Sequence, residues 1–179
     1  MNKVYKSFVA LGIFVGVTIT KPALAQSTGP VPVRVKLGVL LPAQSTTKNF
    51  AGSTQFNAEA DVAIPSLGAG RTLVGLGYSQ GSKNGGKLRS IPLTVTRLFS
   101  PPNPVAGVTG NVYFGLGAGA YFLRASGPGG SASKTRPGAF GVVGYQFPNP
   151  FFVEAKYHIV GKVVGVSPTG LSLMIGRRF

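Results

Sequence analysis

The chain has 179 residues, a length that accommodates one domain, or one domain and a processed segment. Eighteen Lys and Arg residues against three acids give a formal charge of +15. The absence of cysteine excludes a disulfide framework, a thiolate metal site and a lipidated cysteine at a cleavage site. A basic balance of this size directs attention to nucleic acid, an anionic membrane surface or an acidic ligand.

The N-terminus has the order of a secretory signal peptide. Lys3 and Lys6 precede a short apolar run, and the small residues of 23–25 form a cleavage site after it. We therefore predict a signal peptide at 1–25 and a mature domain at 26–179. No later segment reaches the ~18 consecutive apolar residues of a spanning helix. Export then leaves three fates: secretion, the periplasm, or an outer-membrane barrel.

Apolar residues alternate with small or polar residues in eight stretches after the leader. Because successive side chains of a strand point to opposite faces, each stretch predicts a strand with one apolar face. No helix is expected after the leader. The predicted strands cover residues 31–41, 54–64, 72–79, 87–99, 111–124, 138–147, 151–160 and 170–179.

The segments between the predicted strands fall into two groups. One group is read as short turns, as expected on the periplasmic side of a membrane barrel, and comprises 65–71, 100–108 and 148–150. The other group is read as loops on the outer side, and comprises 42–53, 81–86, 124–136 and 161–169.

The fold class expected is an all-β, eight-stranded antiparallel up-and-down transmembrane barrel, closed by pairing of the last strand with the first. The strands of a soluble sandwich or a lipocalin-type barrel would also alternate between apolar and polar residues, but their apolar face would point inward. Two features favour the membrane. The polar face is mostly Gly, Ser and Thr, which suits the small interior of an eight-stranded barrel. Aromatic residues also gather toward the strand ends, as in interfacial girdles.

The three acids of the chain all lie on the inward face of this barrel. A buried charge is costly unless it is paired, so each acid is expected to have a basic partner in the lumen. Each acid has one such partner if the numbers of facing residues sum to 95 on the first two predicted strands and to 332 on the last two. The expected lumen ion pairs are Arg34–Asp61, Lys36–Glu59 and Glu154–Arg178.

Four stretches together resemble the opacity-protein/OmpA-like (OmpW/OmpX-type) family of small outer-membrane barrels. They are SIPLTVTRLF (90–99), VYFGLGAGAYF (112–122), GYQFPNPFFVEAKYH (144–158) and the terminal Phe179. The resemblance implies a monomer in the outer membrane of a Gram-negative-type cell, in contact with lipid and lipopolysaccharide and assembled by the barrel-insertion machinery. It also implies an insertion signal in the last strand, at Leu171, Leu173, Ile175 and Phe179.

No catalytic, metal or cofactor site is expected. Glu154 and His158 share a face but stand about 13 Å apart along a strand, beyond hydrogen-bond reach. Ser172 is a conceivable neighbour of His158, the sole histidine, but lumen parity indicates a histidine satisfied inside the barrel. The run 115–119 (GLGAG) lies inside an alternating strand, so it lacks the context of a phosphate loop.

The sequence thus predicts a non-enzymatic barrel with a structural or surface-interaction role. Alternatives are a porin-like narrow channel for small solutes and a soluble periplasmic ligand-binding barrel. Nucleic acid is not expected as a partner, because the chain is exported and its basic residues are dispersed. An outer basic rim without acids is expected to bind lipopolysaccharide phosphates or anionic glycans; it comprises Lys48, Lys83, Lys87, Arg89, Arg124, Lys134, Arg136 and Lys162.

Overall fold

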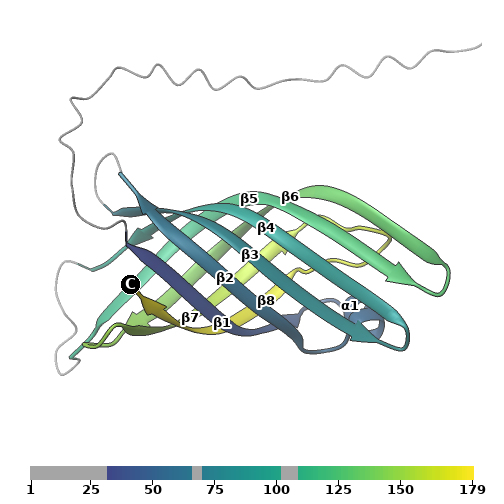
Figure 1. The fold of residues 1–179 in the computed structure, drawn as a ribbon, viewed down its shortest axis with the longest axis horizontal. Helices are drawn as coiled ribbons and strands as arrows, with labels where there is room; N and C mark the ends of the chain where they lie inside the picture. Colours follow the sequence, from purple (N-terminus) through teal and green to yellow (C-terminus); the bar gives the residue numbers. More distant parts are fainter. Residues whose placement is uncertain (1–31, 66–69, 102–108) are drawn as a thin grey trace, which may run out of the picture. The chain divides into compact units, whose positions relative to one another are not determined.

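The computed structural model describes residues 32–65, 70–101 and 109–179, and these form a closed antiparallel barrel. Each strand pairs with its neighbours in sequence, and the last strand pairs with the first (Figure 1). The all-β, up-and-down, eight-stranded architecture is therefore as predicted. The predicted signal peptide at 1–25 and the start of the mature domain lie outside the described residues.

The strands follow the alternating stretches of the sequence closely, and several run further than expected. Their bounds are β1 Val33–Pro42, β2 Gln55–Ile64, β3 Arg71–Lys83, β4 Gly86–Phe99, β5 Asn111–Gly127, β6 Gly130–Gln146, β7 Phe151–Val160 and β8 Gly170–Arg178.

Two predicted loops are strand instead. Residues 81–86 form the tip of a long β3–β4 hairpin, whose turn is Asn84–Gly85 with φ angles of 51° and 77°. Positive φ at both turn residues is the geometry that matches strand twist in a two-residue hairpin. Residues 124–136 likewise extend β5 and β6 to a turn at 128–129. Both segments differ from the predicted loops because backbone pairing between the strands continues through their polar residues.

One helix is present where only loop was expected. The helix α1 (Ser45–Ala51) lies between β1 and β2, and buries Thr47 and Ala51. Thr47 Oγ1 donates to Ser167 O at 3.0 Å and accepts from Ser167 N at 3.0 Å. The helix is thereby fastened to the β7–β8 connection. Figure 1 shows α1 at the same end of the barrel as the β3–β4 and β5–β6 hairpins, which we call the α1 end.

The opposite end of the barrel holds the β6–β7 turn and the C-terminus. Residues 66–69 and 102–108, which carry most of two predicted turns, lie outside the described residues. The third turn, 148–150, is present and is held by Gln146, whose Nε2 donates to Phe151 O at 2.7 Å.

The interior is packed in three layers along the barrel axis. An apolar cluster at the α1 end joins Ala51 and the connection residues Val163 and Val166 to strand residues that include Tyr121. A second apolar cluster, toward the opposite end, includes Tyr113 and Phe152. Charged and hydrogen-bonding side chains occupy the layer between them.

Inward glycines provide room for these large interior side chains. A side chain at Gly144 would collide with the Tyr113 ring, and one at Gly117 would collide with Phe140. The small residues that alternate along β5 and β6 are therefore explained by close packing of a narrow interior.

Candidate functional site

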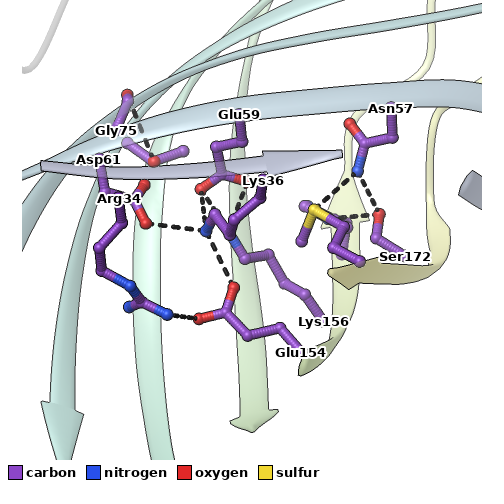
Figure 2. Close-up of polar contacts among 12 residues, drawn as sticks. Arg34, Lys36, Asn57, Glu59, Asp61, Gly75, Glu154, Lys156 and Ser172 are labelled. Atoms are coloured by element: carbon purple, nitrogen blue, oxygen red, sulfur yellow. Dashed lines mark hydrogen bonds and ion pairs between the residues drawn. The ribbon is translucent and has the colours of Figure 1, made fainter. Parts of the chain in front are cut away.

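The middle layer of the barrel contains a cluster of six buried charges, three cations and three carboxylates. All three acids of the sequence belong to it. Because three positive charges face three negative charges, the cluster is formally neutral. The members come from β1, β2 and β7, as Figure 2 shows. The lumen charge cluster consists of Arg34, Lys36, Glu59, Asp61, Glu154 and Lys156.

Lys36 is the centre of this cluster. Its Nζ lies 3.0 Å from Glu59 Oε1, 2.8 Å from Asp61 Oδ2 and 2.9 Å from Glu154 Oε2. One ammonium with three donors thus meets a carboxylate oxygen in each direction. Glu59 also accepts from Lys156 Nζ, at 2.5 Å and 2.7 Å through its two oxygens.

Arg34 occupies the edge of the cluster. Its guanidinium donates to Glu154 Oε1 at 2.5 Å and to the Tyr113 hydroxyl at 2.8 Å, and Tyr113 in turn donates to Glu154 at 3.0 Å. The guanidinium carbon lies 4.1 Å from the centre of the Phe152 ring. Arg34 therefore joins the charged layer to the apolar cluster next to it.

One of the three predicted ion pairs, Lys36–Glu59, is confirmed, and the other charges have partners that were not predicted. The β1–β2 register places Arg34 opposite Asp61 and Lys36 opposite Glu59, as inferred from the sequence. The predicted pair Lys36–Glu59 forms at 3.0 Å, whereas Asp61 pairs diagonally with Lys36 and Arg34 turns to Glu154. Side chains as long as these reach diagonal neighbours across a sheet as readily as direct ones.

The prediction of an ion pair between Glu154 and Arg178 is wrong. Glu154 lies opposite Met174, four residues from the predicted register, and Arg178 lies at the barrel end opposite Arg34. Glu154 instead meets two cations of β1 across the intervening strand β8. Gly176 lies on β8 directly beside Lys36, so no side chain blocks this reach.

The predicted lumen ion pairs did not include two residues of this layer, Lys156 and Tyr113. The available signal was parity, because Lys156 alternates in phase with Glu154 on β7 and Tyr113 falls on the inward face of β5. Nothing local in the sequence indicates that these two strands approach β1 and β2 across the lumen.

A neutral hydrogen-bond network adjoins the charges on the α1 side. His158 Nε2 lies 3.1 Å from Ser172 Oγ, and His158 Nδ1 lies 3.0 Å from the Tyr121 hydroxyl. Ser172 also accepts from Asn57 Nδ2 at 3.0 Å. The Ser172 side chain is completely buried. The imidazole of His158 is oriented by the hydroxyl of Tyr121 and not by a carboxylate. This arrangement fits a satisfied interior histidine and lacks access for a substrate.

The eight basic residues of the predicted outer rim all lie toward the α1 end, but they differ in orientation. Lys87, Arg89 and Arg124 point outward from β4 and β5 and line one surface pocket with Ser126. Arg136 lies on the inward face of β6 and donates through Nε to Lys162 O at 2.8 Å. The exposed lysines are dispersed over α1, the hairpins and the β7–β8 connection, at Lys48, Lys83, Lys134 and Lys162.

The predicted insertion-signal residues share the outward face of β8. Leu173, Ile175 and Phe179 are 44%, 57% and 67% exposed, and Leu171 is half-buried. Arg177 lies on the same face, 5.0 Å from the centre of the Phe179 ring.

No protein-family model matches the chain, and no curated protein matches it significantly. Among the described residues, none of the His, Asp and Glu side chains gather into a group of three that could hold a metal ion. No helix of the described part is long and apolar enough to cross a membrane.

Proposed function

We propose that this chain is a non-enzymatic barrel of the outer membrane of a Gram-negative-type cell, exported by a signal peptide at 1–25. One observation carries the proposal: the barrel is apolar outside and charged inside. Large apolar side chains cover its outward face, for example Leu116 at 71% and Ile159 at 63% exposure, while all three acids are buried in the lumen. A water-soluble barrel has the opposite arrangement.

The apolar wall also has suitable dimensions. On β7 it runs from Phe151 to Ile159, about 26 Å along the strand at 3.3 Å per residue. With the ~40° tilt typical of barrel strands, that corresponds to about 20 Å along the axis. The hydrocarbon-facing band of known outer-membrane barrels is ~25 Å tall.

Aromatic side chains border this wall. Phe99 and Phe114 stack with ring centres 5.8 Å apart, and Tyr145 and Phe147 meet edge to face at 5.0 Å. Both pairs lie near the end opposite α1, together with Arg177, where amphipathic side chains are favoured at a membrane interface. These features support membership of the opacity-protein/OmpA-like (OmpW/OmpX-type) family, with β8 as the insertion signal and a monomer as the assembled state.

The filled interior favours a structural or surface-interaction role over transport. Apolar layers lie on both sides of the charge cluster, and side chains such as Phe140 occupy the space beside the glycines of β5. An aqueous channel requires a wider barrel, as in porins with ~16 strands. Contacts of the protein with lipopolysaccharide phosphates or glycans would then occur through its basic α1 end.

Fractionation and gel mobility test this proposal directly. The full chain should remain with outer membranes after a carbonate wash, and the unheated protein should migrate faster on a detergent gel than the boiled protein. Release by the wash would favour a soluble periplasmic barrel instead.

Conductance in planar bilayers tests the transport alternative. The wild-type protein and Glu154→Gln should both give no resolved current. A current in the wild type that changes with Glu154→Gln would establish a narrow channel and refute the filled-lumen interpretation.

A further inference from the structure

Three cations gather on the outward face of β4 and β5 near the α1 end. Lys87 and Arg89 lie two residues apart on β4, so they share a face. Arg124 lies directly opposite Arg89 on β5, and Ser126 lies opposite Lys87. These four residues line a surface pocket of about 270 Å³. The geometry therefore concentrates three positive charges and one hydroxyl around a single small space.

The protein supplies no negative charge to this pocket. Like charges directly opposite each other on a sheet repel. The sequence contains only three acids, and all of them are buried in the lumen charge cluster. The pocket thus keeps a net positive charge that an anion from outside would neutralise.

Arg89 is held in place at the pocket. Its guanidinium carbon lies 5.8 Å from the centre of the Tyr78 ring, and the Tyr78 hydroxyl donates to Gln80 at 2.6 Å. The Arg89 Nε atom is buried and has no hydrogen-bond partner among the residues that the structure describes. The Arg89 side chain lines the pocket, and a planar guanidinium fork matches the oxygens of a phosphate group.

The position of the pocket indicates which anion occupies it. The next outward pair toward the middle of the barrel is Ile91 and Phe122, which are 37% and 46% exposed and begin the apolar wall. Two strand residues correspond to about 6.6 Å, so the cations lie immediately beyond that wall. In a membrane this is the level of the lipid headgroups.

We infer that Lys87, Arg89 and Arg124 bind a phosphate group of an outer-leaflet lipid headgroup, such as a lipid A phosphate. The inference rests on the proposed function, since it needs the apolar wall to lie in the membrane. The two guanidiniums and the ammonium pair with phosphate oxygens, and the Ser126 hydroxyl donates to one of them. Of the eight residues in the predicted basic rim, these three thus form the phosphate site.

The matched control lies at the same end of the barrel. Lys48, Lys83 and Lys134 are exposed lysines outside the pocket. Replacing these three with Gln removes the same formal charge as the variant Lys87→Gln/Arg89→Gln/Arg124→Gln. A difference between the two triple variants therefore reports on the pocket and not on the net charge of the protein.

The experiment measures binding of bisphosphorylated lipid A to the full mature chain folded in non-ionic detergent micelles. The pocket variant should weaken binding more than tenfold, and the lysine control less than about threefold, because exposed charges are screened by salt. Arg124→Gln alone, at an exposed position, should weaken binding about three- to tenfold, the loss of one charge-assisted contact. Dephosphorylated lipid A with the same acyl chains should bind the wild type as weakly as it binds the pocket variant.

Equal losses in the two triple variants would overturn the inference in favour of diffuse charge attraction. Pyrophosphate that binds as tightly as lipid A would also overturn it, because the pocket would then be a site for a soluble phosphate. A heat-dependent gel shift in every variant verifies that folding is retained. Recovery of the wild-type chain in the soluble fraction would instead contradict the proposed membrane location, independently of the binding comparison.

Discussion

Removal of the Lys156 charge is the most informative perturbation of the barrel interior. Lys156 is buried, and its Nζ contacts both oxygens of Glu59 at 2.5 and 2.7 Å. The substitution Lys156→Met keeps an unbranched side chain of similar length but leaves the lumen charge cluster with two cations and three carboxylates. Breaking a buried ion pair by removing one partner costs about 3 to 5 kcal/mol. We therefore expect Lys156→Met to reduce the free energy of unfolding by that amount.

The double variant Lys156→Met/Glu59→Gln isolates the cause. It removes one cation and one carboxylate together, so the remaining Arg34, Lys36, Asp61 and Glu154 are again neutral as a group. We expect it to recover at least about 2 kcal/mol of the loss, within the range of coupling energies between residues in contact.

Urea unfolding of the refolded barrel supplies the measurement, followed by far-ultraviolet circular dichroism and by the fraction of protein with folded mobility on unheated gels. Glu59→Gln alone completes the mutant cycle. If the double variant were as unstable as the sum of the two single variants, the argument from charge balance would be refuted.

Three further outcomes follow from the structure. Leu93→Arg, in the apolar wall, should cost about 2 to 4 kcal/mol in a bilayer, whereas Ser131→Arg, on the outward face of the β5–β6 hairpin opposite Ser126 and beyond the wall, should be nearly neutral; equal effects in urea titrations would contradict the membrane assignment. Ser172→Ala should cost about 1 to 3 kcal/mol, because Asn57 Nδ2 then keeps only the weak acceptor Met174 Sδ, and neither the wild type nor the variant should hydrolyse an ester substrate. Gly85→Ala, at φ 77°, should cost about 1 to 2 kcal/mol in the same titration; no change would show that the turn relaxes.

The turn of the β3–β4 hairpin is encoded locally in the sequence. Asn84–Gly85 is the dipeptide most typical of a two-residue hairpin turn. The turn residues of 81–86 predict a loop for the whole segment, including Lys83 and Gly86. In the barrel they pair with each other, because strand pairing needs only backbone groups once the hairpin has begun.

The sequence by itself determined the number of strands, their order and the face of nearly every side chain. The physical reason is that side-chain direction alternates with a period of two, whatever the neighbouring strand is. The alternation of Val35 and Leu37 with Lys36 on β1 is sufficient to place the charge on the face opposite the apolar residues. A closed, consecutive pairing then follows from eight such strands, since closure leaves no exposed edge.

Only the tertiary structure decided the register of β7 with β8 and the partners of Arg34, Asp61 and Glu154. A shift of two or four residues leaves every face unchanged, so parity could not exclude the pairing of Glu154 with Arg178. The pairing that forms, of Glu154 with Arg34 and Lys36, depends on the approach of β1 and β7 across Gly176 of β8. Such proximity arises from barrel closure and curvature, which no local pattern of residues encodes.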